Sequence, residues 1–190
     1  MNFKLFFIII LTSLFSCSFK PEDDKEMILW NLERPLTWDD FKGKPERRFA
    51  AASTSYDILK EVNKGTSKNA TVKIEAVFFC QSSWKKKSWI NEQVLEHEQK
   101  HFDIVELYAR KLRKTISETK FSSFADLETK IQSLYDINDK EMDKYQDKYD
   151  DETDGSMNGD KQREWQKSIM KDIKDLDAHK ETTLQINFTK

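Results

Sequence analysis

Hydrophobic and polar positions follow two different periods along the chain, and the first of them is typical of β-strands. Residues 54–62 and 71–82 are rich in β-branched and aromatic residues, and the polar stretch between them contains Gly65. This pattern predicts two antiparallel strands joined by a hairpin loop. The alternating apolar residues of the tail, 183–188, predict a further short edge strand.

From Trp89 onward apolar residues recur every three or four positions, which predicts amphipathic helices. The inward stripe of the first helix includes His97 and His101. Two further helices are predicted over residues 124–145 and 165–176, with a loop between them over residues 150–159. The expected fold class is therefore α+β, with a small antiparallel sheet followed by one helix and two further packed helices.

The N-terminal residues have a different character, which predicts a targeting segment. Residues 5–15 are almost wholly apolar, follow Lys4 and end at Ser16-Cys17. The run is about half the roughly 20 residues that a membrane-spanning helix needs, so a cleaved secretory signal is the better interpretation. Its end resembles the lipobox of bacterial lipoproteins, in which the cysteine is acylated. We expect a signal peptide over residues 1–16, a lipid-anchored tether over 17–26 and a folded domain over 27–190.

This organisation predicts an exported protein of the bacterial cell envelope, bound to the membrane through lipid on Cys17. An alternative is a disulfide between Cys17 and Cys80, the two cysteines of the chain. Cys80 ends an apolar run, however, and a cysteine in such a place usually behaves as a small buried hydrophobic residue.

The charge balance argues against nucleic acid as a partner. Lys and Arg number 32 and Asp and Glu 34, so neither sign dominates. The charged fraction of 35% exceeds the roughly 25% of ordinary globular proteins, and together with few Gly and Pro residues it is typical of long, solvated helices.

The most informative motif is His97-Glu98-Gln99-Lys100-His101 in the first predicted helix. Residues four apart share one helix face, so both imidazoles can bind the same zinc ion. Glu98 then lies beside the metal-bound water, where a carboxylate can act as general base. A chance match would place two histidines on the apolar stripe with no metal, and there they would need other polar partners.

A catalytic zinc normally has a third protein ligand, and the sequence leaves several alternatives open. Glu141 lies on the inward stripe of the second helix, and Asp150 follows in the predicted loop. Glu106 lies about 140° round the helix from His101, which predicts a solvated or supporting carboxylate. Weaker candidates for a ligand are Glu152, Asp154 and His179, and candidates for hydrogen bonding to a developing oxyanion are Tyr108 and Tyr149.

Four segments together resemble the bacterial domain of unknown function 922 family. They are residues 36–45 (LTWDDFKGKP), 97–104 (HEQKHFDI), 149–153 (YDDET) and 162–165 (QREW). Members of that family are predicted zinc-dependent peptidases, so the resemblance implies a zinc ion at His97 and His101 with Glu98 catalytic. Relatives often carry a histidine shortly after the threonine of the third segment, where this chain has Asp154-Gly155.

Two hypotheses for function follow. The first is a zinc-dependent metallopeptidase that cleaves peptide or protein substrates outside the cytoplasm, with a zincin-like layout. By analogy with that layout, the strand near residues 72–79 would hold an extended substrate peptide at the sheet edge. The second is a metal-stabilised envelope lipoprotein that binds a partner and has no turnover.

Overall fold

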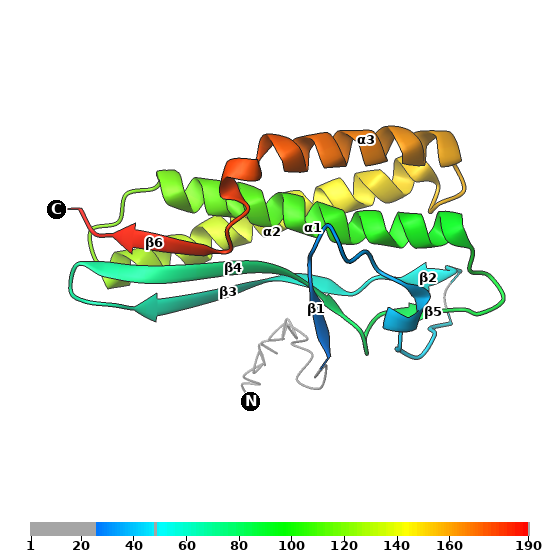
Figure 1. Cartoon of the computed structure of the whole chain (residues 1–190), viewed down its shortest axis with the longest axis horizontal. Helices are drawn as coiled ribbons and strands as arrows, with labels where there is room; N and C mark the ends of the chain where they lie inside the picture. Colours follow the sequence, from blue (N-terminus) through cyan, green and yellow to red (C-terminus); the bar gives the residue numbers. More distant parts are fainter. Residues whose placement is uncertain (1–25, 48, 190) are drawn as a thin grey trace, which may run out of the picture.

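A small antiparallel sheet lies along one side of three helices in the computed structural model of the chain, which describes residues 26–47 and 49–189 (Figure 1). The fold class is α+β, as the sequence predicts. The elements are, in order, β1 (Met27–Leu29), the 3-10 helix η1 (Trp38–Asp40), β2 (Ala52–Ser53), β3 (Tyr56–Lys64), β4 (Asn69–Phe79), β5 (Trp84–Lys85), α1 (Glu92–Glu118), α2 (Phe124–Thr153), α3 (Gly159–Asp175), the 3-10 helix η2 (Asp177–His179) and β6 (Thr183–Asn187).

The predicted signal peptide, Cys17 and nearly all of the predicted tether lie outside the described residues. Cys80 is buried directly after β4, as its apolar neighbours indicate. Among the residues that the structure describes, no helix combines the length and the apolar composition needed to cross a membrane.

The β3–β4 hairpin forms the centre of the sheet, and its pairing runs from Tyr56 opposite Phe78 to Lys64 opposite Ala70. From Asn69 to Ala76 every second residue of β4 is buried, which is the pattern of a strand with one face against a core, and the last three residues of the strand are all buried. The predicted hairpin is therefore confirmed.

The opposite edge of β4 is also occupied, because two short strands share it. β1 pairs with Val77–Phe79, and β6 pairs with Asn69–Lys73. The predicted C-terminal strand is thus confirmed. Backbone hydrogen bonds from Ile74 to Thr182 and from Trp30 to Ala76 fill the interval between β1 and β6. The hypothesis that residues 72–79 hold a substrate peptide is wrong, since both edges of this stretch are already paired.

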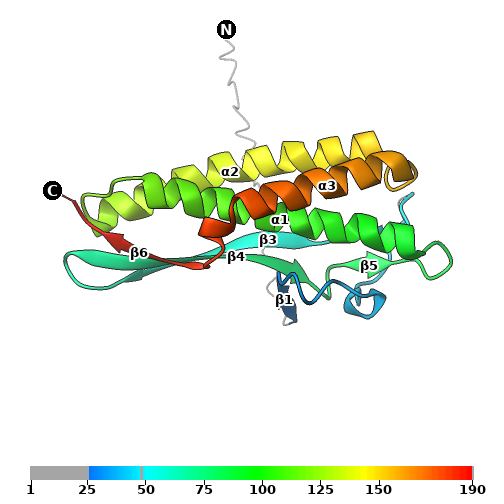
Figure 2. The same cartoon turned by 45° about the horizontal axis from the view of Figure 1, so that its top comes forward.

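Helix α1 lies between the sheet and the other two helices (Figure 2). Its N-terminus is capped by Asn91, whose side chain accepts a hydrogen bond from the backbone N–H of Val94. Because neighbours surround it, α1 buries residues on most of its circumference, including charged ones. Of the two histidines of the H-E-x-x-H motif, His97 is therefore buried, and His101 keeps 12% of its side chain exposed.

Helix α2 is longer than the sequence predicts, because the expected loop at residues 150–159 begins only after Thr153. The inward stripe of α2 continues through Gln146, Tyr149 and Thr153, all buried. Asp154 then ends the helix in a left-handed conformation, with φ of 48°. Asp150 consequently belongs to the last helical turn, where neighbouring residues fix its direction.

A buried ionic network joins α1 to both layers around it. Glu106 Oε1 accepts hydrogen bonds from Arg110 Nε and from the Arg113 guanidinium, both at 2.7 Å. Arg113 also donates to the backbone carbonyl oxygens of Ile74 and His179, at 2.9 and 2.7 Å. Glu106 is therefore a buried structural carboxylate, and the prediction that it would be solvated or support the metal is wrong.

Replacing Glu106 by alanine should strongly destabilise the fold, because two buried guanidinium groups would lose their shared counter-ion. The expected loss is about 3–5 kcal/mol in the free energy of unfolding, measured by chemical denaturation. Glu118→Ala, on the exposed end of the same helix, is the matched control and should change little. Equal effects of the two substitutions would contradict this role.

Candidate metal centre

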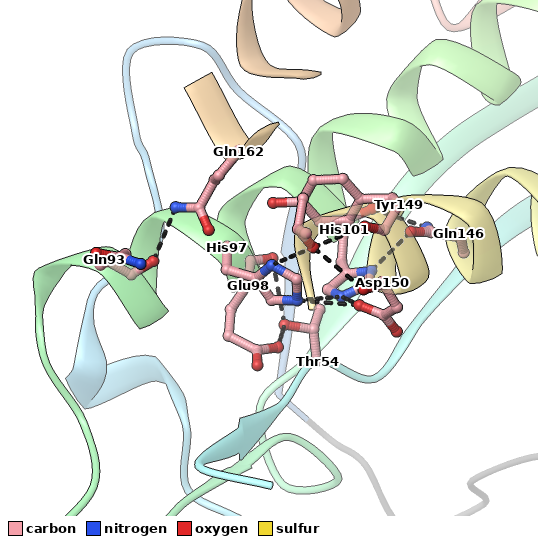
Figure 3. A network of polar contacts seen from close by, with 10 residues as sticks. Thr54, Gln93, His97, Glu98, His101, Gln146, Tyr149, Asp150 and Gln162 are labelled. Atoms are coloured by element: carbon pink, nitrogen blue, oxygen red, sulfur yellow. Dashed lines mark hydrogen bonds and ion pairs between the residues drawn. The ribbon is translucent and has the colours of Figure 1, made fainter. Parts of the chain in front are cut away.

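His97 and His101 point from α1 toward the end of α2, where they meet Asp150 (Figure 3). Asp150 Oδ1 lies 3.0 Å from Nε2 of each histidine, and the two Nε2 atoms are 3.1 Å apart. His97 is 4% exposed, whereas the side chain of Asp150 is half-exposed and closes the group from the outside. Three ligand-type atoms therefore converge on one point.

The antiparallel packing of α1 and α2 produces this meeting. A short connection joins the two helices, so the beginning of α1 lies opposite the end of α2 (Figures 1 and 2). Residues at similar distances from the connection then face each other, as His97 faces Asp150 and His101 faces Gln146.

Gln146 fixes the orientation of the His101 ring. Its Oε1 lies 2.7 Å from His101 Nδ1, and its side-chain amide donates to the His101 backbone carbonyl at 3.0 Å. Since Oε1 can only accept, Nδ1 carries a proton, and Nε2 is the nitrogen left to bind a metal ion or to donate to Asp150. The H-E-x-x-H motif does not predict a role for Gln146, although this residue lies one helical turn before Asp150 on the same face of α2.

Aromatic stacking and a weaker polar contact hold His97. Its ring stacks on Tyr149, with ring centroids 4.7 Å apart and planes 19° from parallel. Its Nδ1 lies 3.5 Å from the Thr153 hydroxyl, which itself donates to the Tyr149 carbonyl at 2.6 Å. The His97 Nε2 is thereby also directed to the shared point.

The group fits a zinc ion in ligand type and spacing. A tetrahedral zinc with bonds of 2.0–2.1 Å separates its ligand atoms by roughly 3.3 Å, close to the 3.0–3.1 Å found here. Two imidazoles and one carboxylate form a donor set typical of hydrolytic zinc sites, which keep a fourth position for water. His97, His101 and Asp150 are therefore the residues that could hold the metal.

The same convergence shifts the acid–base properties of the ligands. Burial alone would raise the pKa of Asp150, but hydrogen bonds from His101 and His97 hold it well below its ordinary value. Burial likewise would lower the pKa of His101, but the hydrogen bond and charge of Asp150 raise it. The carboxylate thus stays ionised and needs a positive charge beside it, which a proton or a metal ion can supply.

Glu98 is 5% exposed and borders the same cavity from the α1 side. The Thr54 hydroxyl donates to its Oε2 at 2.7 Å and so holds the carboxylate in place (Figure 3). Thr54 follows β2, and no sequence pattern singles it out. The cavity has a volume of about 380 Å³ and is lined along one side by residues 49–54, six in a row.

The other predicted candidates lie elsewhere. Glu141 is exposed and borders a separate hollow between α1 and α2. It lies nine residues before Asp150, which places it about 180° round the helix, so the two cannot share a metal. Glu152 accepts a hydrogen bond from Trp165, and Asp154 caps the C-terminus of α2. The backbone carbonyl of His179 accepts a hydrogen bond from Arg113, which lies about 18 Å along α1 from His101.

The two tyrosines that the sequence suggested as hydrogen-bond donors to an oxyanion do not line the metal cavity, whereas a third tyrosine does. Tyr149 is fully buried behind His97, and Tyr108 packs against Tyr145, so both serve the core. Tyr56, at the start of β3, lines the metal cavity instead. Burial, followed by the charges of Asp143 and Asp150, raises its pKa, so the Tyr56 hydroxyl remains a hydrogen-bond donor.

Fold and site together define a class of α+β proteins in which an H-E-x-x-H helix meets an acidic residue from a second, antiparallel helix. The chain belongs to the family described as bacterial protein of unknown function (DUF922), whose model matches residues 29–159. The matched region includes Glu98 and the three candidate metal ligands. No curated protein and no solved structure matches the chain.

Asp150→Asn should weaken zinc binding by roughly tenfold or more, because a neutral amide replaces the ionised ligand. Titration of the purified domain with zinc against a competing chelator measures this. Asp151→Asn removes the same charge from the exposed neighbouring position and should leave zinc affinity nearly unchanged. Equal affinities of both variants and the wild type would exclude Asp150 as a ligand.

Proposed function

We propose that this protein is a zinc-dependent metallopeptidase that hydrolyses peptide bonds outside the cytoplasm. The single observation that carries the proposal is the convergence of His97, His101 and Asp150 in a cavity that Glu98 also borders. A bound zinc ion supplies polarisation of a carbonyl group and a water molecule of lowered pKa. The residues of the chain supply the remaining functions.

Glu98 is assigned the role of general base. Its carboxylate takes the proton of the attacking water and delivers it to the leaving amine. The hydrogen bond from Thr54 keeps the carboxylate in one orientation, so little reorganisation is needed during the reaction. We assign to the Tyr56 hydroxyl, which also lines the cavity, the role of donating to a developing oxyanion.

The substrate peptide is proposed to lie along residues 49–53. All five residues line the cavity, and the last two form strand β2, of which β5 occupies one edge. An extended peptide can form backbone hydrogen bonds with the main chain of such a run. This proposal takes the place of the earlier hypothesis that the substrate binds along residues 72–79, because both edges of that stretch are paired with other strands.

Glu98→Gln should retain zinc but lower kcat/KM for a peptide substrate by roughly 10²–10⁴-fold, because the amide cannot accept the proton. Cleavage of a fluorogenic peptide library, with zinc content measured in parallel, tests this. Glu96→Gln is the control, since Glu96 is exposed on the same helix turn. Unchanged cleavage in Glu98→Gln would rule out the assigned role.

The alternative, a metal-stabilised lipoprotein without turnover, is distinguished by the same measurements. It expects zinc to raise the melting temperature while the wild-type protein cleaves no member of the library. Cleavage by the wild type that is lost in Glu98→Gln would exclude it.

Membrane attachment through Cys17 is part of the proposal and rests on the lipobox-like end of the signal sequence. In a bacterial host, Cys17→Ser should shift the full chain from the membrane to the soluble fraction, because no acyl chain can be added. Cys80→Ala should leave the protein with the membrane. An unchanged distribution of Cys17→Ser would contradict lipid anchoring.

A further inference from the structure

An exposed apolar surface borders the metal cavity. Phe49, Trp89 and Met157 are 95%, 45% and 79% exposed, and each lines a hollow of about 770 Å³. We call these three residues the apolar shelf. Large apolar side chains that gather at a hollow and remain exposed to water are typical of binding surfaces.

The hollow is continuous with the metal cavity. Six residues line both of them: Phe49, Ala50, Ala51, Val94, Gly155 and Ser156. A chain that lies along residues 49–53 with its reacting bond at the metal ligands would therefore place a neighbouring side chain over the shelf. Because the two hollows share so much of their lining, this side chain belongs to a residue close to the cleaved bond.

The shelf is assembled from three separate parts of the chain, two of which contact each other directly. Phe49 and Trp89 contact edge to face, with ring centroids 5.3 Å apart. Lys86 lies over the Trp89 ring, 4.5 Å from its centroid, so part of the indole is already covered. The rest of the indole and the Phe49 ring stay exposed to solvent beside the hollow.

Met157 is positioned by the turn between α2 and α3. Asp154, Gly155 and Ser156 have φ angles of 48°, 53° and 81°, so three successive residues adopt left-handed conformations. The Gln93 side chain donates to the Ser156 backbone carbonyl, and the Gln93 backbone carbonyl accepts a hydrogen bond from the Gln162 side-chain amide at 2.9 Å. These bonds hold the turn against the start of α1 and α3.

From the continuity of the two hollows we infer that the enzyme selects peptides with a large uncharged apolar side chain, such as phenylalanine, leucine or methionine, next to the cleaved bond. This inference rests on the proposed function. Among the described residues that line the shelf hollow, Asp154 is the one with an ionisable side chain, and Lys86 lies over the Trp89 ring beside it. The other lining residues are uncharged, which suits an uncharged substrate side chain.

The test compares kcat/KM for two quenched peptides that differ only in phenylalanine or alanine beside the cleaved bond. The wild type should prefer the phenylalanine peptide roughly 10- to 100-fold, as burial of such a side chain implies. In Phe49→Ala/Met157→Ala this preference should fall about tenfold. Ile137→Ala, an exposed apolar residue away from the site, should retain it.

A binding measurement separates recognition from turnover. In Glu98→Gln protein, calorimetric titration should give tighter binding of the phenylalanine peptide, and the shelf substitutions should remove the difference. Equal rates and affinities for both peptides would overturn this inference and leave the proposed function intact. Failure of the wild type to cleave any peptide would overturn both. Loss of binding to anionic lipid vesicles on shelf substitution, with the peptide preference unaltered, would overturn the inference in favour of a membrane-facing surface.

Discussion

Everything at the candidate site depends on the antiparallel contact between α1 and α2. Neither helix carries a complete ligand set, because the histidines belong to one and Asp150 to the other. Their packing brings three donor atoms within 3.0–3.1 Å of one another, an arrangement that is costly for two imidazole lone pairs and a carboxylate without a shared positive charge. The fold therefore places unfavourable electrostatic interactions together at this site, as is common at functional sites.

The rest of the structure maintains this contact. The sheet supports α1 from one side, and the network around Glu106 attaches the middle of the helix to β4 and to the segment before β6. Gln146 and Thr153 occupy the turns of α2 on either side of Asp150 and orient the two rings. The turn after α2 then forms the side of the cavity where a substrate side chain would lie.

Local patterns in the sequence predict what depends on local periodicity. The hairpin, the three helices and the inward direction of His97 and His101 all follow from spacing along the chain. The end of α2 does not, because the acidic composition of residues 150–154 is typical of a loop, while Tyr149 and Thr153 extend the helix through tertiary packing. For the same reason the sequence cannot choose between Asp150 and Glu141, or identify Thr54 and Tyr56, which come to the site from a segment distant in the chain.

A crystal structure of the protein grown with zinc, with data collected at the zinc absorption edge, tests the central claim most directly. The account predicts one strong anomalous peak within about 2.0–2.2 Å of His97 Nε2, His101 Nε2 and Asp150 Oδ1. A peak coordinated by other residues, or the absence of any peak at this cavity, would contradict it.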